Sequence, residues 1–249
     1  IRFISAIEKK YKSMIYLLIT IIVLLIGIII YSEFTKKQKI NNQKILIEDS
    51  LKHIYDCEHR NTDCTNFSLS GSLSLSKEKT SKIIDLLIEK KLINVIGNKF
   101  RLTSEGKNYA LQVIRIHRLW EKYLAEKTSV GENEWHTIAE IEEHNTSIEK
   151  ANKLAAQLGN PFLDPHGDPI PNENGEIIYN ETLTLNQVKI NSIVKVEHIE
   201  DEPKETYKKL FNNGIYIGTI LKVKNVLNEK IIIEVNGKEL SLSISEADN

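Results

Sequence analysis

The feature that most restricts the fold of this 249-residue chain is an uncharged apolar run near its start. MIYLLITIIVLLIGIII, from Met14 to Ile30, spans 17 residues without one acid or base. A helix packed on the core of a soluble protein needs a polar face, whereas about 17–25 apolar residues suffice to cross a bilayer. The run therefore predicts a transmembrane helix at 14–31, preceded by a juxtamembrane flank at 1–13.

Charge does not orient this run, because four Lys or Arg residues precede it and four follow it within residues 32–44. We predict a cell-membrane location with a single pass and with residues 32–249 in the cytoplasm. The polar residues 32–43 are predicted to form a linker. Since the chain starts at Ile1 rather than Met, the run is also compatible with the last span of a longer protein.

The net charge of −1 conceals a basic segment followed by an acidic one. Residues 77–107 hold eight Lys or Arg against four Asp or Glu, while residues 132–149 hold six acids and neither Lys nor Arg. The overall charge gives no field that would attract nucleic acid, but the basic segment provides a local one.

The only two cysteines, Cys57 and Cys64, bracket the sequence CEHRNTDC. A single C-x6-C lacks the doubled CxxC pattern of a zinc ribbon, and one pair is no disulfide framework. Two unpaired thiols near a loop are expected. A metal loop that includes His59 and Asp63 is the alternative.

Residues 44–110 show the pattern of a winged helix-turn-helix domain. A first helix over QKILIEDSLKHIYDC is followed by a helix that Ser76 would cap, and LINVIGNKFRLT then predicts a hairpin wing with a Gly-Asn turn. In such folds the second helix of the motif enters the major groove and the wing reaches phosphate. The predicted DNA contacts are Lys77, Lys79, Thr80, Lys82, Lys99 and Arg101.

Two observations leave DNA binding open at this stage. The lysines would look the same on an ordinary solvated face, and FSLSGSLSLS, where the preceding helix belongs, is poor in helix formers. That helix is predicted to be short or loose.

WHTIAEIEEHNTSIE, residues 135–149, predicts a helix with four potential metal ligands in an arc of roughly a quarter turn. VIRIHRLWEKYLAE, residues 113–126, is a second amphipathic helix with two more, one turn apart. Carboxylates in such a group repel one another unless a cation or protons compensate, so a cation site is favoured over a merely solvated face. The six residues are His117, Glu121, His136, Glu140, Glu143 and His144.

The motifs LTSEGKNYALQVIRIHRLWEKYL, WHTIAEIEEHNTS and LGNPFLDPHGDPIP resemble the diphtheria toxin repressor family of metal-dependent regulators. This resemblance covers roughly residues 44–247. It implies a multi-domain α+β protein with a winged helix-turn-helix at 44–110, an all-α metal-binding and dimerisation domain at 111–171, and an SH3-like β-barrel at 183–247. Period-two alternation in IYIGTILKV and IIIEVNGKEL agrees with the last of these, and the same segments are similar to small ferrous-transport accessory proteins.

The resemblance also implies two metal sites. The primary site would use Asp49, Glu140, Glu143 and His144, and the second site would use His117, Glu121 and His136. Oxygen and imidazole donors suit Mn²⁺ or Fe²⁺, and Zn²⁺ is compatible by affinity order. One departure from the manganese-type pattern is Lys52, which stands where those members carry Glu, so a single Asp49 site is expected rather than a two-metal cluster.

DPHGDPIP offers further potential ligands in Asp164, His166 and Asp168. Its three prolines and one glycine instead indicate a stiff, turning connector after the helical domain.

Together these features predict a metal-dependent, membrane-tethered regulator that binds double-stranded DNA as a homodimer and has no enzymatic activity. The alternative is the cytoplasmic metal-sensing region of a manganese, iron or zinc transporter permease, with transporter subunits as partners.

Overall fold

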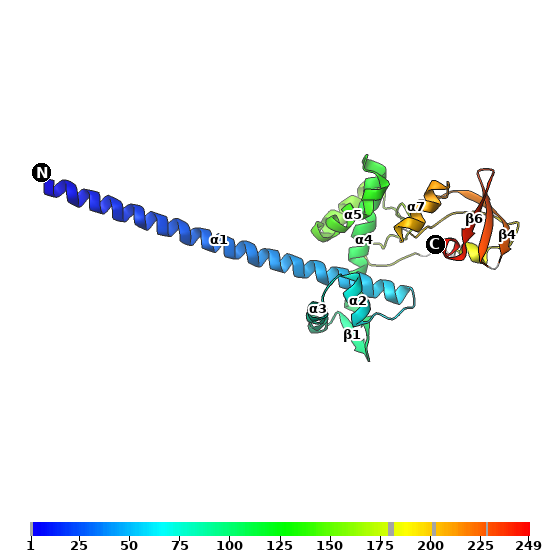
Figure 1. Ribbon diagram of the computed structural model, residues 1–249, viewed down its shortest axis with the longest axis horizontal. Coiled ribbons are helices and arrows are strands. Elements are labelled where there is room, and N and C mark those ends of the chain that lie inside the picture. Colours follow the sequence, from blue (N-terminus) through cyan, green and yellow to red (C-terminus); the bar gives the residue numbers. More distant parts are fainter. Residues whose placement is uncertain (1, 179–181, 201–202, 228) are drawn as a thin grey trace.

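The computed structural model describes residues 2–178, 182–200, 203–227 and 229–249, with side chains from residue 24 onward. One long helix, α1 (Arg2–His59), runs into a body of helices, and a small sheet lies at the far side of that body (Figure 1). The last three to four turns of α1 carry the first residues of the metal centre.

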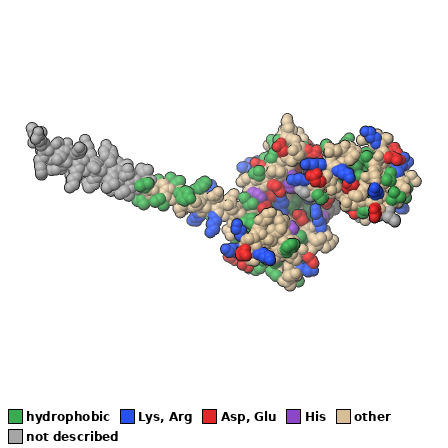
Figure 2. Space-filling view, in the orientation of Figure 1, with side chains coloured by type: hydrophobic (Ala, Val, Ile, Leu, Met, Phe, Trp, Pro, Cys, Tyr) green, Lys and Arg blue, Asp and Glu red, His purple; other side chains and the backbone are tan. Residues whose placement is uncertain are grey.

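The predicted membrane location is contradicted by the structure. Among the helices searched in the described part of the chain, none combines the length and the apolar content needed to cross a bilayer. The described part of the predicted span runs from Leu24 to Tyr31 and is apolar. Figure 2 shows this stretch exposed. The rest of the predicted span 14–31, namely 14–23, lies outside the residues whose side chains are described.

The predicted linker at 32–43 is helical and belongs to α1 without interruption. No Gly or Pro occurs in this segment, and its Lys, Gln and Ile residues are compatible with a helix. A polar composition suggested a linker, but polarity alone does not break a helix.

The winged helix-turn-helix fold is present as predicted. Its core joins the end of α1 to the elements that follow and includes Leu51, Leu87 and Phe100, all buried. The elements are α2 (Asn66–Ser72), α3 (Lys77–Glu89), β1 (Ile93–Ile96) and β2 (Lys99–Leu102).

Helix α2 forms although its sequence is poor in helix formers. Thr65 accepts a hydrogen bond from the Ser68 backbone N–H, and the Ser68 hydroxyl accepts one from the Thr65 N–H. This capping box satisfies two backbone donors, and Leu69 anchors the helix in the core. The helix is short, as expected, but it is capped and packed.

The wing is an antiparallel hairpin in which Ile93 pairs with Leu102 and Ile96 with Lys99. Gly97 sits in its turn with φ of 64°, a conformation that favours glycine. The turn and both strands were predicted from the sequence.

Three helices form the next layer: α4 (Ser104–Lys127), α5 (Glu132–Asn145) and α6 (Ile148–Gln157). Helix α4 crosses α1 and connects the winged helix to the metal-ligand helices (Figure 1). Its start packs so closely on the wing that a Cβ on Gly106 would lie 1.9 Å from the Leu92 carbonyl oxygen. Only glycine permits this approach.

The C-terminal part contains a four-stranded antiparallel sheet in the order β3-β4-β5-β6. Its core includes Val223, Ile231 and Ile233, which are fully buried. The β-class prediction is confirmed, whereas a closed SH3-like barrel is not. The elements are η1 (Leu185–Gln187), β3 (Ile193–Lys195), α7 (Lys204–Asn212), β4 (Ile220–Leu227), β5 (Lys230–Val235), β6 (Lys238–Ser243) and α8 (Ile244–Ala247).

The DPHGDPIP segment forms a tight connector. Asp164 accepts hydrogen bonds from the backbone N–H groups of His166 and Asp168, at 2.8 and 2.9 Å. Arg118 of α4 donates to the Asp168 carboxylate at 2.9 Å and to the Pro169 carbonyl at 2.6 Å. These contacts fix the segment against α4, as the sequence-based interpretation of a structural connector expects.

Candidate metal centre

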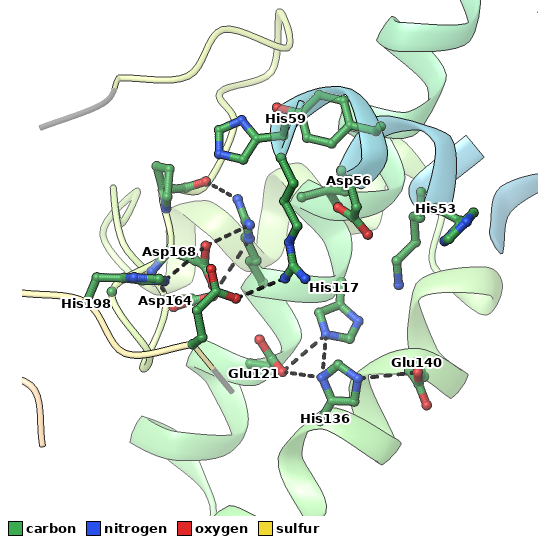
Figure 3. Close-up of a pocket in the computed structure, with 18 of the residues that line it drawn as sticks. His53, Asp56, His59, His117, Glu121, His136, Glu140, Asp164, Asp168 and His198 are labelled. Atoms are coloured by element: carbon green, nitrogen blue, oxygen red, sulfur yellow. Dashed lines mark hydrogen bonds and ion pairs between the residues drawn. The ribbon is translucent and has the colours of Figure 1, made fainter. Parts of the chain in front are cut away.

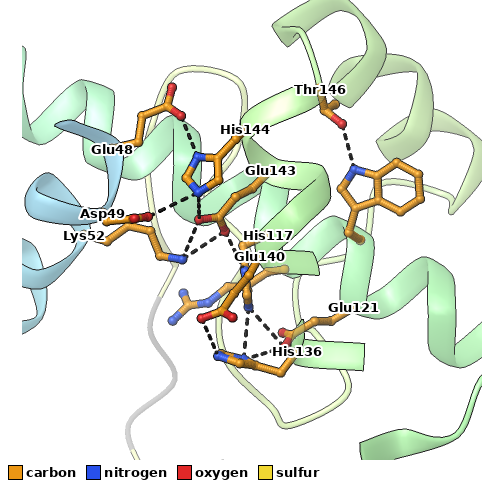
Figure 4. Close-up of polar contacts among 12 residues, drawn as sticks. Glu48, Asp49, Lys52, His117, Glu121, His136, Glu140, Glu143, His144 and Thr146 are labelled. Carbon is orange, nitrogen blue, oxygen red and sulfur yellow. Dashed lines mark hydrogen bonds and ion pairs between the residues drawn. The ribbon is translucent and has the colours of Figure 1, made fainter. Parts of the chain in front are cut away.

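The potential ligands gather where α4 and α5 face the end of α1 (Figure 4). Histidine and acidic side chains also border a hollow in this region of the surface (Figure 2). The hollow is a cleft of ≈ 780 Å³ lined by residues from α1, α4, α5 and the connector. Figure 3 shows the α4 and α5 ligands on one side of it and Asp164, Asp168 and His198 on another.

The first group, here called the His117 cluster, consists of His117, Glu121 and His136, whose potential ligand atoms lie within 4.8 Å of one another. One Glu121 oxygen is 3.1 Å from His117 Nε2 and 3.2 Å from His136 Nδ1. Glu121 is 2% exposed, so the carboxylate is held away from water. The predicted second site is thus brought together as a compact group.

The second group, the His144 cluster, consists of Asp49, Glu143 and His144, again within 4.8 Å. Asp49 lies 3.2 Å from His144 Nε2, and Glu143 lies 3.6 Å from the same nitrogen. Asp49 comes from α1, while the other two come from α5. This cluster therefore connects the winged helix to the helical domain.

The predicted primary site is only partly brought together, because Glu140 is outside the His144 cluster. Its carboxylate is 3.3 Å from His136 Nε2, and its side chain is 54% exposed. Glu140 precedes Glu143 by almost one turn of α5, so it points along the helix toward the His117 cluster. Glu140 therefore contacts a ligand of the other group in the structure.

Sequence reasoning missed Glu48, which is 3% exposed. Its carboxylate lies 2.7 Å from His144 Nδ1 and accepts a 2.8 Å hydrogen bond from the Tyr109 hydroxyl. A partner carboxylate commonly orients a ligand histidine through its second nitrogen. The only signal was that Glu48 adjoins Asp49 on a helix.

Lys52 stands where manganese-type members of the family carry Glu. Its ammonium nitrogen donates to both oxygens of Glu143, at 2.8 and 2.9 Å. His117 Nδ1 also lies 2.6 Å from one of these oxygens. Glu143 thus has two cationic or proton-donating partners and links the two clusters.

The pKa values follow from this arrangement. Burial opposes the charged form of His144, but Asp49 and Glu48 outweigh it and raise its pKa to about 9. Burial likewise opposes the charge on His117, yet Glu121 and Glu143 raise its pKa above the usual value. Protonated imidazoles thereby share with Lys52 the task of neutralising the buried carboxylates.

The pKa of Glu143 is lowered in the same arrangement. Burial would raise the pKa of this carboxyl, but His117 and Lys52 together hold it below the usual range. The pKa of Glu121 is lowered in the same way, against burial, by His117 and His136. Both carboxylates are ionised at neutral pH, which is the form that binds a cation.

The donor set fits a divalent transition metal. It offers carboxylate oxygen and imidazole nitrogen without a thiolate, a combination that suits Mn²⁺, Fe²⁺ or Zn²⁺. Each cluster supplies three ligand atoms. A metal must displace the proton on His144 before this imidazole can ligate it.

Residues 103–172, which contain every ligand of α4 and α5, match the family described as "Iron dependent repressor, metal binding and dimerisation domain". Residues 183–249 match the FeoA domain. The comparisons support the diphtheria toxin repressor family.

Relatives in this repressor family match over most of the chain. The iron-dependent repressor IdeR of Mycobacterium leprae is 26% identical over 203 residues, which cover 76% of this chain and 88% of that protein. A solved manganese-dependent transcriptional repressor in complex with manganese has a TM-score of 0.74 at 26% identity, covering 81% of this chain and 96% of that one.

A different kind of protein matches over a shorter stretch. A probable metal transport system membrane protein of Chlamydia trachomatis is 37% identical over 86 residues, or 34% of this chain. The match spans only 19% of that protein's length. The repressor relatives account for far more of both chains.

The residues predicted for DNA contact in a repressor of this kind lie on α3 and the wing. Lys77, Lys79 and Lys82 are exposed on α3. Thr80 is fully buried, and its hydroxyl donates to the Ser76 carbonyl at 3.0 Å, so its side chain does not face outward as predicted. The helix was identified correctly, but Thr80 falls on its inner face.

The two wing residues share an acidic partner. Lys99 lies 2.6 Å and Arg101 3.3 Å from the Asp63 carboxylate. Asp63 belongs to the loop after α1, and Lys99 holds the pKa of its carboxyl below the usual range. These bases are therefore paired rather than free in the structure.

Proposed function

We propose that the protein is a metal-dependent transcriptional repressor that binds double-stranded DNA as a homodimer. The observation that carries the proposal is the His144 cluster, because its ligands come from both α1 and α5. A metal bound there would fix the winged helix relative to the helical domain. The repressor relatives support the same function by similarity.

The change would be a shift between populations of conformations. Before a metal binds, Lys52 and protons on His117 and His144 balance the carboxylates. A divalent ion that replaces these protons would hold Asp49 more tightly than His144 alone does, because a +2 ion attracts carboxylates more strongly than an imidazolium does. The ion thus favours one orientation of the DNA-binding helix.

Dimerisation gives this orientation its effect on DNA. Two copies of α3 would have to match the spacing of two half-sites on the duplex, about one helical turn or a multiple of it. A small rotation of each winged helix against its helical domain alters that spacing. Metal binding and DNA binding are thereby coupled, and each strengthens the other.

Mn²⁺ or Fe²⁺ is proposed as the regulatory metal, since three of the six cluster ligands are carboxylates and the rest imidazoles. Zn²⁺ would bind the same donors by affinity. The alternative hypothesis, that the chain is the metal-sensing region of a transporter permease, is not favoured, because the match to the membrane transport protein covers only 34% of this chain.

The test is metal-dependent binding of a DNA library by the purified protein, with Mn²⁺, Fe²⁺ or Zn²⁺ added or chelated. Selection of a two-half-site sequence only when metal is present supports the proposal. His144→Ala is expected to abolish the metal dependence, with Lys150→Ala, an exposed change on α6, as the control. Equal DNA binding with and without metal would reject the function.

A further inference from the structure

A third group of potential ligands lies outside the α4–α5 centre, in the winged helix. His53, Cys57 and Cys64, here called the thiol cluster, present ligand atoms that all lie within 4.8 Å of one another. His53 and Cys57 are one turn apart on α1, so they share a face of the helix. Cys64 arrives from the loop between α1 and α2.

We propose that the thiol cluster is a binding site for a thiophilic metal ion of the Zn²⁺ class, separate from the α4–α5 centre. It has two sulfur donors and one imidazole, the combination that selects Zn²⁺ over Mn²⁺. The site would tie α1, the following loop and the wing together. This inference does not rest on the proposed regulatory function.

The spacing of the donors agrees with tetrahedral coordination. Zn–S bonds of about 2.3 Å and Zn–N bonds of about 2.05 Å at a tetrahedral angle place sulfur and nitrogen about 3.6 Å apart. Cys57 Sγ and His53 Nε2 are 3.6 Å apart in the structure. The imidazole nitrogen thus already faces the sulfur at the separation that a shared ion requires.

Ser68 lies near the position of a fourth ligand. Its hydroxyl oxygen lies 3.3 Å from His53 Nε2 and 3.8 Å from Cys64 Sγ. Both distances are close to the edges of a tetrahedron around a small ion. Ser68 can therefore hold a water molecule as the fourth ligand or occupy that place itself.

The surroundings suit a neutral metal complex. Cys57 is 7% exposed and Cys64 is fully buried, and two thiolates with one +2 ion and a neutral imidazole carry no net charge. Burial lowers the pKa of His53, so its ring is neutral and able to ligate at neutral pH. His53 also lines the cleft, which provides a path for the ion.

The same burial argues against a reactive thiol pair. Burial raises the pKa of the Cys64 thiol to about 12, so the thiolate that attacks oxidants or disulfides is scarce at neutral pH. A metal ion can still displace the proton, because it binds the thiolate directly. Coordination is thereby favoured over disulfide exchange.

The cluster is joined to the wing by the backbone. The Phe100 N–H of β2 donates to the Cys64 carbonyl at 2.9 Å, and the neighbouring Asp63 holds both wing bases. An ion on Cys64 would therefore restrict the wing as well as the loop. His59 and Asp63, the residues first considered for a metal loop here, are not in this cluster.

Cobalt provides the decisive test, because a Cys thiolate bound to Co²⁺ gives a ligand-to-metal absorption that carboxylates and imidazoles do not. The purified protein, kept under a non-thiol reductant without oxygen, is titrated with Co²⁺ and then with Zn²⁺. We expect one thiolate-bound Co²⁺ per chain and its displacement by Zn²⁺. Absence of this absorption would overturn the proposal.

Variants separate this site from the α4–α5 centre. Cys57→Ser and Cys64→Ser should remove the absorption, whereas the double change H117A/H144A should leave it in place. Since a change at fully buried Cys64 can impair folding, His53→Gln provides a milder variant that keeps both thiols. It should weaken Zn²⁺ binding at least roughly tenfold, as loss of outer partners alone costs about 10–100-fold.

Two further results would contradict the site. One is unchanged Zn²⁺ affinity in His53→Gln, and the other is loss of the absorption in H117A/H144A while folding is intact. Because DNA binding is not measured, failure of this experiment leaves the proposed function untouched.

Discussion

The ammonium nitrogen of Lys52 lies 2.8 and 2.9 Å from the two carboxylate oxygens of Glu143, a side chain with no exposed surface. Glu143 is also the carboxylate that links the two ligand clusters. The chain therefore carries an internal cation at the point where a divalent ion would draw the carboxylates together. Lys52 opposes that ion by charge and competes with it for Glu143.

Replacing Lys52 by Met should raise the affinity for Mn²⁺ by at least about tenfold, because it removes a positive charge next to the bound ion and frees a ligand. The same change should lower the free energy of unfolding without added metal by about 1–3 kcal/mol, since a buried carboxylate loses its partner. Isothermal titration and urea denaturation measure the two effects.

The control for this change is Lys150→Met on α6, an exposed site away from both clusters. This change should alter neither the Mn²⁺ affinity nor the free energy of unfolding. A Lys52→Met protein with weaker Mn²⁺ binding would show that Lys52 supports the site instead of opposing the ion.

The raised pKa of His144 predicts how metal affinity changes with pH. With a pKa of about 9, this imidazole is protonated at neutral pH and must lose its proton to ligate. Mn²⁺ affinity should therefore rise roughly tenfold per pH unit between pH 6.5 and 8.5 for each proton displaced. Titrations in buffers with different ionisation enthalpies count the protons released, and a count of zero would contradict the assignment.

Protonation of His144 also stabilises the folded protein, so stability without metal should fall with rising pH while Mn²⁺ affinity rises. The pKa of His144 in the folded protein lies above its unfolded value of about 6.5. Its contribution to the free energy of unfolding is therefore complete below pH 6.5 and is lost as the pH rises through about 9. The loss should be about 3 kcal/mol at most without added metal. Urea denaturation at both ends of this range measures it, and His144→Gln should remove the pH dependence.

Helical spacing was sufficient to place His117 and Glu121 together, because they share a face of one helix whatever the rest of the fold does, whereas the resemblance added His136 to their cluster. The contact of Asp49 with His144 depends on how α1 packs against α5. The separation of Glu140 and Glu143 into different clusters depends on the same packing. Those contacts are set by tertiary packing, which spacing within one segment does not contain. The resemblance provided Asp49, and nothing provided Glu48.

Other differences have similar physical causes. Thr80 was assigned to the DNA-facing side from its neighbours, but its position on α3 coincides with the inward stripe of Ile83, Ile84 and Leu87. The thiol cluster was missed because its imidazole, His53, lies one turn before Cys57 instead of inside the loop. In both cases the helical phase of the residue was the signal that could have been used.

Glu143 and Glu140 should differ sharply in their effect on metal binding. Glu143 is buried within a cluster, while Glu140 is 54% exposed and lies 3.3 Å from His136 of the other cluster. Glu143→Gln should lower Mn²⁺ affinity by more than about 100-fold and Glu140→Gln by less than about tenfold. Equal losses would place Glu140 in the primary site after all, as the sequence predicted.

Gly106→Ala should destabilise the fold by about 1–3 kcal/mol or more, because its Cβ would collide with the Leu92 carbonyl and push α4 from the wing. Gly71→Ala in α2 is the matched control, since nothing lies within 4 Å of a Cβ there. That variant should be neutral or stabilised by up to about 1 kcal/mol. Thermal and urea unfolding compare the two, and similar stabilities would remove the argument for close packing.

The placement of α3 residues predicts which ones act in DNA binding. Changing Lys77, Lys79 or Lys82 to Ala should weaken binding and reduce the slope of log affinity against log salt by about 1 each, because each exposed lysine would release one counterion. Thr80→Val should leave the slope unchanged and cost about 1 kcal/mol of stability, since its buried hydroxyl donates to Ser76. Fluorescence anisotropy with metal across a salt series gives the slopes. An altered slope in Thr80→Val, or none altered in the lysine variants, would mean that α3 does not lie against the phosphates.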